Sequence, residues 1–118
     1  LIRIPGGDLA SKRIEHRVAG GDTNPYLVMT AVLGSALLGI EKKLTPIKPV
    51  MNNAYSNSAE KLANNWEDAV NYFGNDKGIK QIFSKQLIDN LIRTKRQELS
   101  EFKKIESSKH WKYYVATI

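Results

Sequence analysis

The segment Arg13-Ile-Glu-His-Arg-Val-Ala-Gly-Gly-Asp-Thr-Asn-Pro-Tyr-Leu27 organises this chain of 118 residues. Its first six residues alternate between charged and less polar side chains with a period of two, which predicts a β-strand. Such a strand presents Arg13, Glu15 and Arg17 on one face. Guanidinium groups suit phosphate and carboxylate oxygens, and a carboxylate can bind a hard cation such as Mg²⁺. The strand therefore predicts a site for an anion and a metal ion, although the same triplet also fits a solvated surface with weak ion pairs.

A second strand is expected at residues 1–5. The Pro-Gly-Gly-Asp turn that follows allows these residues to pair with residues 13–18 as a hairpin with a longish loop. That pairing brings Arg3 close to the charged face that carries Glu15. His16 falls on the opposite face, so we expect a packed or supporting histidine rather than a metal ligand or an acid–base group.

Residues 25–43 predict a long helix. Asp22 or Asn24 can cap its start, and Pro25 suits the first turn because a missing amide hydrogen has no consequence there. The helix is apolar on several sides and contains small residues such as Gly34. Because a surface helix normally keeps one polar face, this composition is typical of a buried, closely packed helix.

Three further helical segments are expected after a polar loop. One helix runs from Asn64, whose capping-box partner is Glu67, to Gly74. A short helical turn lies near residues 78–83, and Ser84 then caps a long amphipathic helix. The last ten residues form an apolar tail that we expect to dock on the rest of the protein or on another subunit. The fold class is therefore α+β, mostly helical, with two N-terminal strands followed by a buried helix and further helices.

Composition argues against several classes of protein. The chain has no cysteine, so it cannot form a disulfide or a thiolate metal site. It shows no membrane-length apolar run and no signal peptide, so a cytoplasmic location is expected. The net charge is +6, but Glu98, Glu101 and Glu106 lie among the late basic residues. This mixed-charge surface differs from the one-sided basic patch of nucleic-acid-binding proteins, so no nucleic-acid partner is expected.

Residues 13–28 resemble a conserved segment of the glutamine synthetase family, in which an R-[I/L]-E-x-R strand precedes an N-P-Y-L helix start. The form E-H-R-V-A-G is more similar to the γ-glutamylpolyamine, or glutamate–putrescine, ligase branch. The resemblance covers nearly the whole chain. It implies that residues 1–118 are the C-terminal portion of the catalytic domain, truncated at the N-terminus.

The resemblance implies an ATP-dependent ligase that joins glutamate to ammonia or an amine through γ-glutamyl phosphate. It assigns Mg²⁺ or Mn²⁺ binding to Glu15, and contact with glutamate and the acyl phosphate to Arg17. It assigns the nucleotide phosphates to Arg13, and both phosphate and substrate to Arg3, so Arg3 and Arg17 are the implied catalytic residues. Tyr55 lies where some bacterial members are adenylylated, but the expected Leu-Pro-Pro-Glu sequence does not follow it, so we expect a loop tyrosine.

The resemblance also implies a ring-shaped homo-oligomer for the full-length protein. The family's other metal ligands and its amine site fall before residue 1, so we expect residues 1–118 alone to be inactive, and the nitrogen donor stays open. The alternative is a small basic helical interaction domain without catalysis, in which the charged strand is only a surface.

Overall fold

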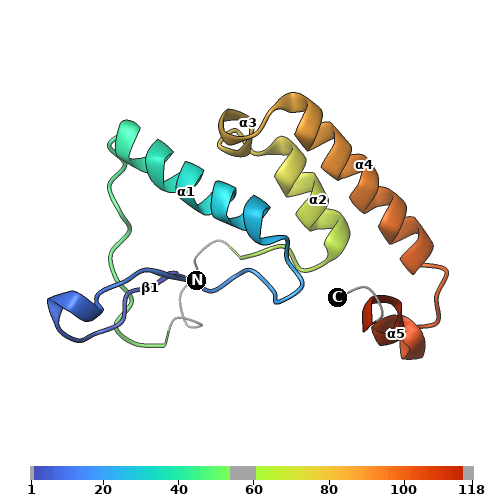
Figure 1. Cartoon of the computed structure of the whole chain (residues 1–118), viewed down its shortest axis with the longest axis horizontal. Helices are drawn as coiled ribbons and strands as arrows, with labels where there is room; N and C mark the ends of the chain where they lie inside the picture. The colour runs from blue at the N-terminus through green and yellow to red at the C-terminus, as the bar shows by residue number, and fades with distance from the viewer. Residues whose placement is uncertain (1, 54–60, 116–118) are drawn as a thin grey trace.

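The computed structural model describes residues 2–53 and 61–115, with residues 113 and 114 described by their backbone only. It confirms a mostly helical α+β chain with one two-stranded sheet (Figure 1). Tyr55 lies outside the described residues. The elements in chain order are β1 (Ile2–Arg3), η1 (Leu9–Ser11), β2 (Glu15–His16), α1 (Pro25–Glu41), α2 (Trp66–Asn75), α3 (Ile79–Ile82), α4 (Lys85–Phe102), η3 (Ser107–Lys109) and α5 (His110–Val115).

The predicted hairpin is present. Strands β1 and β2 pair antiparallel, with Arg3 opposite Glu15. Each strand has only two residues, so both are shorter than predicted. The connection is ordered by the short helix η1, because the Asp8 carboxylate accepts a hydrogen bond from the Ser11 backbone amide at 2.8 Å. The hydrogen bonds to Ser11 also hold the pKa of Asp8 below its ordinary value.

Helix α1 begins as the sequence predicts. Asn24 is the cap, and its side-chain oxygen accepts hydrogen bonds from the backbone amides of Tyr26 and Leu27 at 3.0 and 3.2 Å. Pro25 occupies the first turn, where it leaves no amide hydrogen unpaired. Of the two predicted caps, Asn24 rather than Asp22 is therefore the one used.

The prediction that α1 is buried is wrong for the described structure. The helix contains no buried residue. Its main packing partner is α3, which contacts it where Gly34 faces Ile82. Large apolar side chains on another side of α1 face solvent, because none of the described elements covers them. Within the described ranges, no helix is long and apolar enough to cross a membrane.

Helix α2 starts one residue later than predicted. Asn65 is its cap and accepts a hydrogen bond from the Asp68 backbone amide at 2.8 Å, so the predicted pair of Asn64 and Glu67 is wrong. The helix also continues through Gly74 to Asn75. Gly74 lies close to α4, since a Cβ atom there would lie 2.8 Å from Cδ1 at the end of the Ile92 side chain.

Helices α2 and α4 pack side by side and contribute two of the three buried apolar side chains among the described residues (Figure 1). Val70 on α2 and Ile88 on α4 are buried, as is Phe83 in the turn between α3 and α4. Ser84 caps α4 as predicted, accepting a hydrogen bond from the Leu87 backbone amide at 3.3 Å. The predicted apolar side of α4 thus faces α2.

The C-terminal tail folds back onto the end of α4. The His110 ring lies 4.0 Å from the Phe102 ring between centroids, and its Nε2 lies 2.9 Å from the Ile105 carbonyl oxygen. Trp111 and Val115 remain exposed on α5. The tail therefore docks on its own chain through His110, and the side chains of Trp111 and Val115 stay free of that contact.

Candidate functional site

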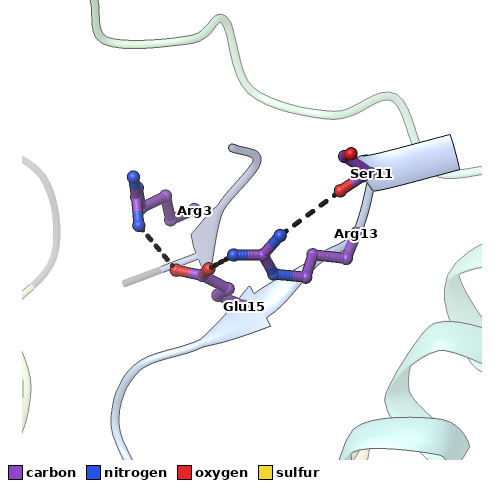
Figure 2. A network of polar contacts seen from close by, with 4 residues as sticks. All are labelled: Arg3, Ser11, Arg13 and Glu15. Carbon is purple, nitrogen blue, oxygen red and sulfur yellow. Dashed lines mark hydrogen bonds and ion pairs between the residues drawn. The ribbon is translucent and has the colours of Figure 1, made fainter. Parts of the chain in front are cut away.

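The hairpin holds one carboxylate between two guanidinium groups (Figure 2). Arg3 Nη1 lies 3.0 Å from one oxygen of Glu15, and Arg13 Nη2 lies 2.9 Å from the other. The strand register places Arg3 directly opposite Glu15, and the period of two places Arg13 on the same face. Arg13 also donates to the Ser11 carbonyl oxygen at 3.3 Å, so the η1 turn helps to position its side chain.

These contacts fix the charge on Glu15. Partial removal of its carboxyl group from water raises the pKa, but the hydrogen bonds and positive charges of Arg3, and then of Arg13, outweigh this effect. The net result is a pKa below the ordinary value for glutamate. The carboxylate therefore keeps its charge to a lower pH than an ordinary glutamate, and both of its oxygens are oriented by arginine donors.

The structure does not bring Arg17 to this cluster. Strand β2 ends at His16, so the strand alternation does not extend to Arg17, whose side chain is exposed. It takes no part in the hydrogen bonds and ion pairs found within residues 2–53 and 61–115. His16 is also exposed, so the prediction of a packed histidine is wrong. No described element packs against the face of the hairpin that carries His16, so that face is exposed to solvent.

The hairpin offers one carboxylate to a metal ion. Among the described residues, no group of three or more His, Cys, Asp or Glu side chains is placed to hold a metal. Magnesium is commonly bound through one or two carboxylates together with substrate phosphates, so Glu15 fits a share of such a site and cannot form one alone. The flanking arginines suit the phosphates that such a metal accompanies.

Two shallow hollows lie elsewhere, along the contact between α2 and α4. Their volumes are about 360 and 310 Å³, and they share Val70, Asn71 and Arg96. Arg96 donates to the Asn71 side-chain oxygen at 3.1 Å. Local sequence patterns do not point to Asn71 and Arg96 as neighbours, because these two residues are 25 positions apart and lie on different helices. The cluster around Glu15 lines neither hollow, and the side chains of its two arginines are more than half exposed.

The family described as the catalytic domain of glutamine synthetase matches residues 1–114. A glutamate–isopropylamine ligase from a Pseudomonas species is 38% identical over 95 residues, covering 78% of this chain and 21% of that protein. A glutamine synthetase from Methanococcus maripaludis is 29% identical, covering 98% of this chain and 28% of that protein. The γ-glutamylputrescine synthetase PuuA of Escherichia coli is 30% identical over 104 residues, covering 88% of this chain and 22% of that protein. The chain thus spans about a quarter of the length of these relatives. No solved structure matches it significantly.

Proposed function

The chain belongs to the glutamine synthetase family, and we propose that the protein is an ATP-dependent ligase that joins glutamate to ammonia or an amine through γ-glutamyl phosphate. In this proposal, residues 1–118 form the C-terminal portion of its catalytic domain. The observation that carries the proposal is the Glu15 carboxylate, which the hairpin holds between the guanidinium groups of Arg3 and Arg13 within the matched residues.

Glu15 is the proposed ligand of Mg²⁺ or Mn²⁺. Desolvation raises the pKa of its carboxyl group, but Arg3 and Arg13 lower that pKa by more, so the carboxylate keeps its charge to a lower pH than an ordinary glutamate. A carboxylate has about four lone-pair positions, so two arginine hydrogen bonds leave acceptor capacity for a cation. Further ligands come, in this proposal, from outside residues 1–118 and from the nucleotide. When bound, the metal neutralises charge on the phosphate being transferred.

The three arginines are the proposed binders of anionic groups. A guanidinium group has five N–H donors, and Arg3 uses one nitrogen to hold Glu15. Its remaining donors can reach a phosphate or the substrate. Arg13 is the proposed contact to the nucleotide phosphates. Arg17 makes no side-chain hydrogen bond or ion pair within the described residues, so all of its guanidinium donors can bind the substrate glutamate and the acyl phosphate.

The proposed reaction has two steps. A γ-carboxylate oxygen of glutamate attacks the γ-phosphorus of ATP, the bond to the β-phosphate oxygen breaks, and ADP leaves. Nitrogen then attacks the acyl carbon, the bond to phosphate oxygen breaks, and the nitrogen loses a proton. Such reactions depend mainly on positioning and on neutralising negative charge. Arg3 and Arg17 would act on the charge that develops at the phosphoryl group.

The exposure of the hairpin favours the alternative, a small basic interaction domain without catalysis. The side chains of Arg3 and Arg13 are 56% and 60% exposed, which is typical of a solvated surface. In the ligase proposal, the residues that enclose the site come from the rest of the catalytic domain and from neighbouring subunits of a ring-shaped oligomer. Residues 1–118 alone would then have no ligase activity.

The deciding experiment uses the protein made from the whole reading frame of the gene. ADP release is measured with glutamate and ATP, offering ammonia, putrescine and isopropylamine in parallel. We expect nitrogen-dependent turnover that falls at least about 100-fold in Glu15→Gln, which keeps the shape of the side chain but removes its charge. The preferred donor then identifies the branch of the family.

The matched control is Glu101→Gln, which removes the same charge from an exposed ion pair with Lys104 at the end of α4. We expect its turnover to equal that of the wild type. Absence of turnover with every donor, or equal turnover in Glu15→Gln and wild type, would support the interaction domain instead.

A further inference from the structure

The two hollows between α2 and α4 adjoin and form one groove, which we call the α2–α4 groove. Its lining residues recur at intervals of three or four positions on both helices, as the residues of one helical face do. The pairs that face each other across it are Gly74 and Ile92, Asn71 and Arg96, and Glu67 and Lys103. The two helices are therefore antiparallel, and the groove follows them for about two turns. Figure 1 shows that they lie away from the hairpin.

The groove has an apolar floor and charged rims. Val70, which lines both hollows, is buried, and Ile92 and Leu99 are half-buried. Ionisable side chains are almost never fully buried, so the rims are typical of a surface exposed to solvent. The ionisable residues of the rims are Glu67, Asp89, Arg93, Arg96 and Lys103.

Both acidic side chains of the rims already have a cationic partner. Lys103 Nζ lies 3.1 Å from a carboxylate oxygen of Glu67. Asp89 is paired in the same way with Lys85, one turn earlier on α4. These two pairs balance the negative charges of the groove, so the remaining positive charges determine which partner the groove attracts.

The remaining positive charges are the guanidinium groups of Arg93 and Arg96. Arg96 donates to the side-chain oxygen of Asn71, which is neutral. Arg93 takes part in no hydrogen bond or ion pair in the part of the chain that the structure describes. The two arginines are three positions apart on α4, so they lie on the same face of the helix. They therefore offer two uncompensated charges, with most of their N–H donors unused.

We propose that the α2–α4 groove is a docking site for an acidic segment of a partner protein. Carboxylates of the segment bind Arg93 and Arg96, and one of its aliphatic side chains covers the apolar floor. The guanidinium fork matches the geometry of a carboxylate, and recognition of acidic motifs by arginine clusters is a recurring mode of peptide binding. The groove contains no residue that the proposed ligase reaction uses, so this binding is a separate function.

Other anions fit the groove less well. A site for a small molecule encloses most of its ligand, whereas both hollows are shallow and both arginines are exposed. A nucleic acid presents a continuous row of phosphates and needs a continuous basic surface. The carboxylates of Glu67 and Asp89 interrupt such a surface here. A short segment with a few carboxylates matches both the length of the groove and its two uncompensated charges.

The test uses the protein made from the whole reading frame and a fluorescent peptide of about 15 residues, long enough to form several helical turns. The peptide carries glutamate at every third or fourth position, with leucine between the glutamates. The control peptide carries glutamine in place of each glutamate. Fluorescence anisotropy measures the affinity of both. Two exposed ion pairs predict that the glutamate peptide binds about 5- to 30-fold more tightly.

The contact is located with paired variants. The Arg93→Gln, Arg96→Gln double variant should weaken binding of the glutamate peptide by the same factor. The matched control, Lys80→Gln with Lys104→Gln, removes two positive charges from positions that line neither hollow, and its affinity should match that of the wild type. Lysine at positions 93 and 96 keeps the charge and should retain part of the affinity.

Several results would overturn the inference: no binding, equal affinity for the two peptides, or an equal loss in the control variant. A loss with lysine at positions 93 and 96 as large as with glutamine would also overturn it. Displacement of the peptide by equimolar inorganic phosphate would indicate a small-anion site instead. Tighter binding of a single-stranded oligonucleotide of equal charge would indicate a nucleic-acid partner. Turnover is assayed separately, so specific peptide binding by an inactive protein would contradict the proposed function and leave this inference standing.

Discussion

The contact between α1 and α3 gives a sharp test through Gly34→Ala. A Cβ atom at position 34 would lie 2.6 Å from Cγ2 and 2.9 Å from Cγ1 of Ile82. These carbons are close to the Ile82 backbone and belong to a β-branched side chain, so they cannot move away without shifting α3. At Gly39 in the same helix, nothing lies within 4 Å of an added Cβ.

Two effects of opposite sign determine the result. Alanine is about 1 kcal/mol more favourable than glycine in a helix interior. Overpacking a close contact typically costs about 1–3 kcal/mol. We therefore expect Gly39→Ala to raise the free energy of unfolding by up to about 1 kcal/mol. Gly34→Ala should instead lower it by about 0–2 kcal/mol, because the clash with Ile82 outweighs the gain in helix propensity.

The assay is urea unfolding of the protein made from the whole reading frame, followed by circular dichroism, with a double-mutant cycle between positions 34 and 82. In an Ile82→Ala background the clash is removed, so Gly34→Ala should become stabilising by about 1 kcal/mol. The expected coupling between the two positions is about 1–3 kcal/mol. Equal stabilisation by Gly34→Ala and Gly39→Ala, or a coupling near zero, would refute the packing of α1 on α3.

Two further predictions concern the ion-pair cluster and a helix cap. The pKa of Glu15, followed by carboxyl NMR, should lie below the ordinary glutamate value. It should rise in an Arg3→Gln, Arg13→Gln double variant, because only desolvation of the carboxyl group then shifts it. An unchanged pKa would mean that the ion pairs are absent in solution. Because the folded-state pKa is depressed, the cluster should stabilise the hairpin above the unfolded-state pKa and lose that effect as the pH falls through the folded-state pKa. Asn65→Ala should lower the free energy of unfolding by about 0.5–2 kcal/mol because it removes the cap of α2. Asn64→Ala should change it by less than about 0.5 kcal/mol, and the reverse order would restore Asn64 as the cap.

The starts of two helices and the pairing of the hairpin could be predicted from the sequence because their signals are local. Asn24 and Ser84 each cap a helix through backbone amides two or three residues away. The period of two places Arg13 beside Glu15, and the turn after residue 5 returns the chain so that Arg3 pairs with it. Two adjacent asparagines at the start of α2 carry the same signal, so the cap was misplaced by one position.

The family could also be predicted from the sequence, because it rests on the order of residues in one segment. The R-I-E-H-R strand and the N-P-Y-L helix start lie within the residues that match the glutamine synthetase catalytic domain. The roles proposed for Glu15, Arg3 and Arg13 are supported by the ion pairs among them and remain predictions.

Burial was decided only by the tertiary structure. A repeating pattern shows which side chains share a face of a helix or strand, but it does not show what covers that face. The apolar composition of α1 and the alternation at His16 both predicted packing, yet His16 is exposed and α1 has no buried residue in the described structure. The contacts of Gly34 with Ile82, and of His110 with Phe102, join separate elements. Such contacts depend on how the elements meet in space, so local sequence patterns do not contain them.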